Sequence, residues 1–304
     1  VEVVDYLMHK NITSNAMSAS IMNLIYKKVI EVEEVPNSKN KKEYKFTLKE
    51  NQEKTNETEQ YLIDFLFTKV GHDNTFTSKE LKDYAKSTKT CEKFGSSYTS
   101  WKNKVISDGK KQNFYETHHQ AGAIGVVFLL IAILLNILVA INSAVIPTAF
   151  LATFVAIVFL IYTLTFTKRT KKGVEHFTKW KAFKKFLNDF GTFDTKELPE
   201  IILWERYMVY ATLFGLAEKV AKTMNVRIKE LEATGIYTTG YYPTFGDWYF
   251  FHSLNNMVTS TINANSAAIT SLHANSSSSS GSGFGGGFSS GGGFGGGGGG
   301  GRGF

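Results

Sequence analysis

The chain has 304 residues, a formal net charge of +7, 43% hydrophobic residues and a single cysteine. This length allows two small domains beside a membrane segment. Cys91 has no second cysteine to pair with, which excludes an intrachain disulfide and agrees with a reducing, cytoplasmic location.

Residues 1–52 predict a winged-helix-like α+β module. Met17, Ile21 and Leu24 recur at helical spacing within residues 14–28. Two candidate strands follow, at residues 29–35 and 44–48, joined by a polar, Lys-rich turn. The order helix, helix, hairpin is that of a winged-helix unit.

Residues 53–117 predict a second, helical cytoplasmic module. Residues 55–67 begin with good capping residues, another helix begins at Ser78, and a third covers residues 91–108. We expect both modules to lead into the membrane.

A winged helix also raises a DNA-binding hypothesis. The phosphate contacts would be Lys27, Lys28, Lys39, Lys41, Lys42 and Lys45. Their charge is offset by Glu31, Glu33, Glu34 and Glu43. Apart from Asn23, the second helix has no cluster of polar side chains that could form hydrogen bonds with base edges. We therefore do not expect nucleic-acid binding, and keep a membrane-tethered DNA-binding regulator as the alternative function.

Residues 118–167 contain no Asp, Glu, Lys or Arg. A membrane-spanning helix needs roughly 20 apolar residues, and this stretch holds two such runs, at residues 120–141 and 145–167. Asn142-Ser143 and Pro147 lie between them, where one helix ends easily and another begins. The pattern predicts a hairpin of two transmembrane helices.

The cations around this hairpin predict its orientation. Lys102, Lys104, Lys110 and Lys111 precede it, Lys168, Arg169, Lys171 and Lys172 follow it, and the connecting turn has none. Lys and Arg near span ends favour the cytoplasmic side. We expect a multi-pass plasma-membrane protein with both flanks cytoplasmic, whose basic residues meet anionic lipid headgroups.

Residues 168–232 predict cytoplasmic amphipathic helices. In the first, Trp180 lies on an aromatic arc with Phe183, Phe186, Leu187 and Phe190, and a second arc carries Lys181, Lys184 and Lys185. The aromatic arc would lie in the headgroup layer or pack on the next helix, and both readings stay open. A long helix is expected over residues 198–224.

The segment from Tyr207 to Val220, YMVYATLFGLAEKV, resembles the signature of the bacterial YciQ-like predicted membrane proteins, known as domain of unknown function 2207. The matching positions are Tyr207, Tyr210, Ala211 and Gly215. Val209 stands where that family often has Pro. The resemblance implies an extracytoplasmic domain and a first span upstream of Val1, in line with a chain that opens without Met. It implies no known reaction.

Residues 233–273 are polar and aromatic, with a weak helix expected in their Ser/Thr/Asn-rich part. Trp248, Tyr249, Phe250 and Phe251 would anchor the segment to the membrane surface or to the preceding helices. Residues 274–304 are almost wholly Ser and Gly and are expected to be disordered.

The sequence contains no recognisable catalytic, cofactor or metal-binding pattern. The seven His are scattered, without metal-ligand spacing, and Cys91 has no neighbouring His. The preferred hypothesis is a mainly α membrane protein that is not an enzyme. It would act as a scaffold or signal relay for an unidentified cytoplasmic protein partner or a lipid surface. An enzyme completed by an N-terminal part is a third reading.

Overall fold

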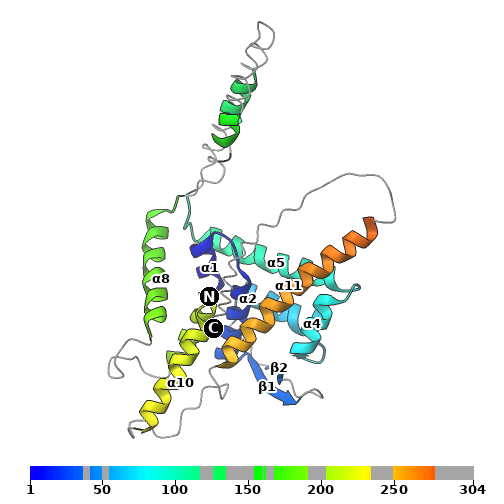
Figure 1. The fold of residues 1–304 in the computed structure, drawn as a ribbon, viewed down its shortest axis with the longest axis vertical. Helices are drawn as coiled ribbons and strands as arrows, with labels where there is room; N and C mark the ends of the chain where they lie inside the picture. Colours follow the sequence, from blue (N-terminus) through cyan, green and yellow to red (C-terminus); the bar gives the residue numbers. More distant parts are fainter. Residues whose placement is uncertain are drawn as a thin grey trace, which may run out of the picture.

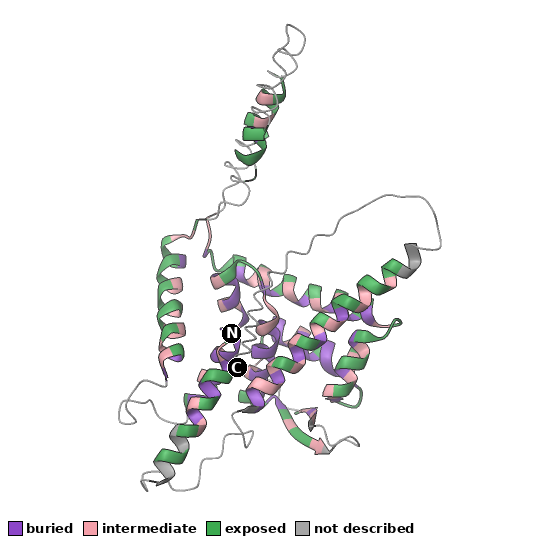
Figure 2. Ribbon diagram, in the orientation of Figure 1, coloured by how far each residue is buried: buried purple, intermediate pink, exposed green. Residues whose placement is uncertain are grey.

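The computed structural model describes residues 1–36, 42–49, 55–116, 126–134, 154–159, 161, 168–190, 203–233 and 249–277. These ranges form a mostly helical body with one small sheet (Figure 1). The buried apolar side chains form one cluster that runs through both the N-terminal and the C-terminal helices (Figure 2). The mainly α class is thus confirmed for the described residues.

The first unit has the predicted order of helix, helix and hairpin. It comprises α1 (Glu2–His9), α2 (Ser14–Tyr26), β1 (Ile30–Pro36) and β2 (Lys42–Leu48). The two strands are antiparallel, with Val32 opposite Phe46. Alternating side chains of β2 turn Tyr44 and Phe46 into the core, as the period of a half-buried strand requires.

The winged-helix reading of this unit finds no support. Its second helix, α2, would be the DNA-reading helix, yet nine of its residues are buried. The helix packs against α1, α9 and α11 as well as β1. A helix so covered cannot enter a DNA groove, because base readout needs an exposed face.

The second unit joins the sheet of the first. It comprises α3 (Glu57–Ile63), η1 (Asp64–Val70), β3 (Thr75–Thr77), α4 (Ser78–Lys86) and α5 (Cys91–Lys111). β3 pairs antiparallel with β2, and the rings of Phe46 and Phe76 stack with centroids 4.5 Å apart. The described parts of the two predicted modules, residues 1–52 and 53–117, therefore share one sheet and one core.

The helix expected over residues 55–67 changes type at its middle. Asn56 caps α3 in a capping box with Glu59, as the capping pattern predicts. From Asp64 the chain continues as the π-helix η1. Because a π-helix has a wider turn than an α-helix, the angle between successive side chains around its axis is smaller. Phe65, Leu66 and Phe67 can therefore all be buried on one side.

The C-terminal part contains α8 (Lys171–Asp189), α9 (Trp204–Leu213), α10 (Ala217–Ala233) and α11 (Tyr249–Ser277). The single helix expected over residues 198–224 is wrong, because the chain breaks between α9 and α10. Gly215 adopts φ +72°, and the backbone NH of Leu216 donates to Ala211 O at 2.7 Å. This left-handed glycine ends α9 in the manner of a Schellman cap.

α11 is longer and better packed than the weak helix expected for its region. It spans 29 residues and lies across α2 and α4 (Figure 1). Phe250, Phe251, Leu254 and Val258 on one side of it are buried. Residues 274–277, expected to begin the disordered tail, are helical, and residues 278–304 lie outside the described ranges.

Of the predicted transmembrane hairpin, the structure describes helical residues 126–134 and 154–159, which lie beyond the helical body (Figure 1). The remainder of residues 120–141 and 145–167, Ile161 apart, falls outside the described ranges. Within those ranges, no helix combines the length and the apolar character needed to cross a bilayer.

Candidate functional site

The two ends of the uncharged stretch 118–167 are held together by the backbone. The NH of Glu116 donates to Lys168 O at 2.9 Å, and the NH of Thr170 donates to Phe114 O at 3.0 Å. Tyr115 and Arg169 are antiparallel bridge partners between them. We call residues 114–116 and 168–170 the neck, because the chain leaves the body and returns to it there.

The neck is attached to the C-terminal end of α1. Tyr115 Oη donates to Leu7 O at 2.8 Å, and Arg169 Nη2 lies 3.5 Å from Leu7 O and from Met8 O. The last carbonyls of a helix lack intrahelical partners and carry partial negative charge. A hydroxyl and a guanidinium at this end therefore stabilise α1 and fix the neck upon it.

The half-buried Tyr115 has both aromatic and cationic neighbours. Its ring meets that of Tyr6 edge to face, with centroids 5.6 Å apart. Burial raises the pKa of the Tyr115 hydroxyl, against the opposing effect of the Arg169 guanidinium. The hydroxyl is thus kept protonated and able to donate to α1.

The neck also fixes the start of α8. Thr170 caps this helix by accepting from the NH of Gly173 at 3.0 Å, and its hydroxyl donates to Asn113 O at 2.7 Å. The guanidinium carbon of Arg169 lies 3.8 Å from the centroid of the Phe177 ring. Gly173 faces Phe114 O so closely that a Cβ would lie 2.0 Å from it.

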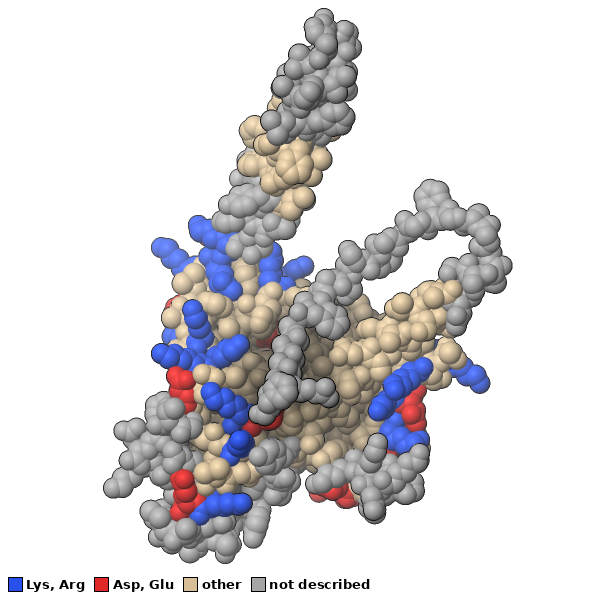
Figure 3. Space-filling model, in the orientation of Figure 1, with Lys and Arg blue, Asp and Glu red and all other residues tan. Residues whose placement is uncertain are grey.

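Basic side chains surround the neck. Figure 3 shows Lys and Arg gathered on the end of the body from which residues 126–134 and 154–159 project. Lys168, Lys171 and Lys172, which were predicted to face the membrane surface, are exposed there, and Arg169 is half-buried. The exposed Lys110 and Lys111 at the end of α5 and Lys10 after α1 also belong to this part of the chain.

Lys10 was missed by sequence reasoning, because it lies more than 100 residues from the hairpin along the chain. Its ammonium lies 5.8 Å from the Tyr115 ring centroid. Conversely, Lys102 and Lys104 lie over the rings of Tyr98 and Tyr61. Burial lowers the pKa of Lys102. These two lysines, predicted to flank the hairpin, therefore lie in the middle of α5 and contact rings of the body.

The aromatic arc of α8 packs on α9. The Trp180 ring lies 4.9 Å from that of Tyr210, and the Phe183 ring lies 5.6 Å from that of Tyr207. Of the two readings left open for this arc, the structure supports packing on the next helix. Lys181 and Lys185 are exposed, whereas the Lys184 ammonium lies 5.7 Å from the Phe214 ring centroid, beside the aromatic arc.

The motif residues of the family resemblance have structural positions. Tyr207 and Tyr210 present their rings to α8, Ala211 is fully buried, and Gly215 ends α9. All four therefore fix how α8, α9 and α10 pack. Among the described residues, no group of His, Cys, Asp and Glu is placed to hold a metal ion.

The helical residues beyond the neck expose large apolar side chains. Phe128 and Leu130 are 55% and 60% exposed, and Phe154 and Val155 are 65% and 58% exposed. The rings of Phe128 and Phe159 meet edge to face with centroids 5.6 Å apart, so the two helical stretches lie side by side. Exposed apolar surface of this kind marks a site that another apolar phase or partner covers.

Comparison with family models identifies the chain's family. Residues 1–224 match the model described as "Predicted membrane protein (DUF2207) C-terminal domain". The chain belongs to this family, which confirms the resemblance found in the sequence. Neither the curated proteins nor the solved structures gave a match.

Proposed function

We propose that this member of the DUF2207 family is anchored in the plasma membrane by a hairpin of two transmembrane helices, at residues 120–141 and 145–167. Its helical body lies on the cytoplasmic side. The observation that carries the proposal is the neck, because pairing of residues 114–116 with 168–170 brings both ends of the uncharged stretch to one place. A segment that leaves and returns at one point crosses a bilayer an even number of times.

The charge around the neck supports the same orientation. Lys168, Lys171, Lys172, Lys110 and Lys111 would lie at the level of anionic headgroups, where each cation contributes roughly 1 kcal/mol to attraction. Beyond them the apolar side chains of residues 126–134 and 154–159 would face lipid. The edge-to-face contact of Phe128 with Phe159 fits two neighbouring spans.

In this proposal the body acts by binding, as a scaffold or signal relay, and performs no reaction of its own. α1, α5 and α8 all end or begin beside the neck, so three helices of the body meet at the point where the anchor would be attached. Its partners would be anionic lipid headgroups and a cytoplasmic protein.

Thiol labelling in living cells tests the topology. Cys91 is fully buried, so it is first replaced by Ala, and single cysteines are introduced by Ser100→Cys in α5, Thr178→Cys in α8 and Ser143→Cys in the predicted turn. A membrane-impermeant maleimide should label position 143 on intact cells and positions 100 and 178 after permeabilisation. Labelling of position 100 or 178 on intact cells would refute the cytoplasmic location of the body, and labelling of positions 100 and 178 under different conditions would refute the hairpin.

A lipid assay tests the headgroup contact. The full chain is placed in nanodiscs of phosphatidylcholine with or without phosphatidylglycerol, and its thermal unfolding is followed. Anionic lipid should raise the midpoint for the wild type and raise it less for the triple variant Lys168→Gln, Lys171→Gln, Lys172→Gln. The matched control replaces Lys79, Lys82 and Lys86 of α4 by Gln. Equal effects of the two triple variants would contradict the neck contact.

A further inference from the structure

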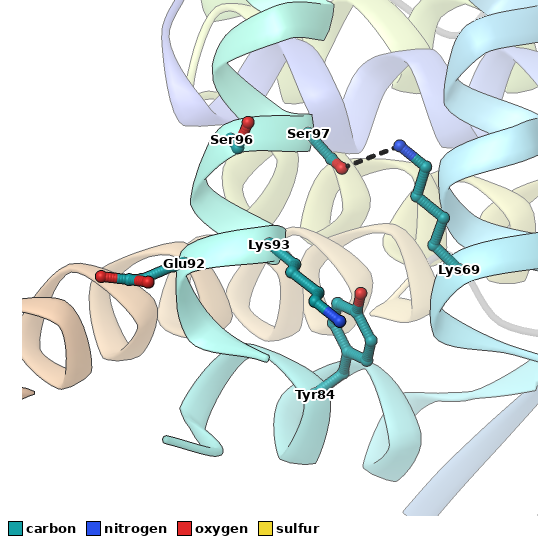
Figure 4. A pocket seen from close by; sticks show the side chains of 6 residues that line it. All are labelled: Lys69, Tyr84, Glu92, Lys93, Ser96 and Ser97. Carbon is teal, nitrogen blue, oxygen red and sulfur yellow. Dashed lines mark hydrogen bonds between the residues drawn. The ribbon is translucent and has the colours of Figure 1, made fainter. Parts of the chain in front are cut away.

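An open groove of about 550 Å³ lies between η1, α4 and α5, and six side chains line it (Figure 4). They are Lys69, Tyr84, Glu92, Lys93, Ser96 and Ser97. Pockets of this size accommodate small-molecule ligands. The groove's polar groups are two ammonium groups, three hydroxyl groups and one carboxylate. The net charge inside the groove therefore depends on whether the carboxylate points into it.

Lys69 is placed in the groove by an unusual piece of backbone. It belongs to η1, and π-helical turns occur frequently at functional sites. Its ammonium donates to the buried hydroxyl of Ser97 at 3.2 Å, as the dashed line in Figure 4 marks, and lies 5.7 Å from the Tyr61 ring centroid. A neutral hydroxyl leaves the positive charge of Lys69 uncompensated by this bond.

The carboxylate of the groove is directed elsewhere. In Figure 4 the Glu92 side chain points away from Lys69 and Lys93. Its Oε1 lies 3.5 Å from His273 Nε2 of α11. Lys93 extends from α5 toward Tyr84. The inward-facing charge is thus positive.

We propose that this groove binds a small phosphorylated molecule of mononucleotide size. Lys69 and Lys93 would bind the phosphate as two point charges, and the Ser97 hydroxyl would hold Lys69 in position. The half-buried ring of Tyr84 would support the flat organic part of the ligand. A phosphorylated ligand matches two ammonium groups better than a ligand with one carboxylate would, because a phosphate group carries up to two negative charges.

The groove is separate from the neck. Both lie along α5, and Ser97 and Lys111 are far enough apart in this helix to place them roughly 20 Å from each other at about 1.5 Å per residue. Failure of the groove to bind a ligand would therefore leave the membrane proposal unchanged, and failure of the anchor would leave this one unchanged.

Calorimetry of the full chain tests the proposal. The protein is held in nanodiscs of phosphatidylcholine, a lipid with no net charge. It is titrated at fixed ionic strength with adenosine monophosphate and, separately, with adenosine. The variants are Lys69→Gln and Lys93→Gln, with Lys69→Arg to retain the charge. The matched control is Lys110→Gln, which removes an exposed lysine from the same helix at the neck. Thermal unfolding confirms that each variant is folded.

We expect saturable binding of the monophosphate at one site, weakened at least tenfold by Lys69→Gln and by Lys93→Gln. Lys69→Arg and Lys110→Gln should stay within threefold of the wild type, and adenosine should bind at least tenfold more weakly. The proposal is overturned by absence of saturable binding, by equal affinity for adenosine, or by an equal loss in Lys110→Gln.

Discussion

Tyr115 and Arg169 are bridge partners across the two ends of the apolar segment, and both side chains reach the same carbonyl oxygen, that of Leu7 in α1. One helix end therefore fixes both strands of the neck. The neck therefore cannot leave the end of α1 without breaking these bonds.

Tyr115→Phe should lower the free energy of unfolding by about 1 kcal/mol, the usual net value of one hydrogen bond. The change removes the bond to Leu7 O and keeps the ring against Tyr6. Chemical denaturation measures the difference. Tyr26→Phe is the control, because the Tyr26 side chain is 36% exposed. Equal effects would argue against an anchoring role for the Tyr115 hydroxyl.

Gly173→Ala should destabilise the protein by about 1–3 kcal/mol, the usual range for overpacking. In an ordinary helix this change stabilises, because Ala is the better helix former. Here the new Cβ would meet the backbone carbonyl of Phe114, which cannot rotate away. Val174→Ala at the next, exposed position is the control. A stabilising Gly173→Ala would mean that the neck is not held this close to α8.

Asn265→Ala should cost about 1–3 kcal/mol, since it removes two buried hydrogen bonds and leaves the Ala85 carbonyl, in the last turn of α4, without its donor. The Asn265 amide in α11 donates to Ala85 O at 2.9 Å and to Cys91 O at 2.7 Å, joining α4 to α5. Hydrogen exchange should be faster at the start of α5. Asn263→Ala, two residues away and exposed, should leave both stability and exchange unchanged.

Glu59→Ala should lower the free energy of unfolding by roughly 1.5–3 kcal/mol, the usual value for loss of hydrogen bonds to a charged group. The Glu59 carboxylate accepts from Lys27 Nζ at 2.6 Å and Asn23 Nδ2 at 2.8 Å, and it closes the capping box of α3. Glu57→Ala, at an exposed position of the same helix turn, is the comparison. Similar losses in the two variants would refute the buried network.

His9 should make stability depend on pH. Its hydrogen bond to Asp5, at 2.8 Å, raises the pKa of the His9 imidazole above its ordinary value of 6.5. When the pKa of a group is higher in the folded than in the unfolded protein, its protonated form stabilises the fold. This stabilisation is complete at pH values below the unfolded-state pKa and is lost as the pH rises through the folded-state pKa. The difference in unfolding free energy between the wild type and His9→Gln should thus be larger at pH 5.5 than at pH 8.5. An equal difference at the two pH values would contradict a stabilising role for the His9–Asp5 hydrogen bond.

Local patterns allowed the N-terminal elements to be predicted. Met17, Ile21 and Leu24 repeat at helical spacing and all are fully buried in α2. The capping boxes that begin at Asn56 and Thr77 are formed by neighbouring residues, so they too could be read from the chain. The pairing of β3 with β2 could not be predicted from local patterns. β3 has three residues, too few for a strand signal, and it joins β2 through tertiary contacts.

The neck was half predictable. The cations on both sides of residues 118–167 indicated a membrane-facing surface, but its attachment to Leu7 and Met8 depends on contacts more than 100 residues apart. α11 was underestimated because Ser, Thr and Asn have low helix propensity, and its stability comes from packing of residues such as Phe251 and Leu254. The groove was missed entirely, since Lys69 and Lys93 come from separate helices.

The family match ends at residue 224, whereas α11 begins at Tyr249 and lies across α2. A recombinant fragment trimmed to the matched region would lose this cover and bare the apolar side of α2, with aggregation as the foreseeable result. Production of the body for crystallography or screening should therefore retain the chain through Ser277.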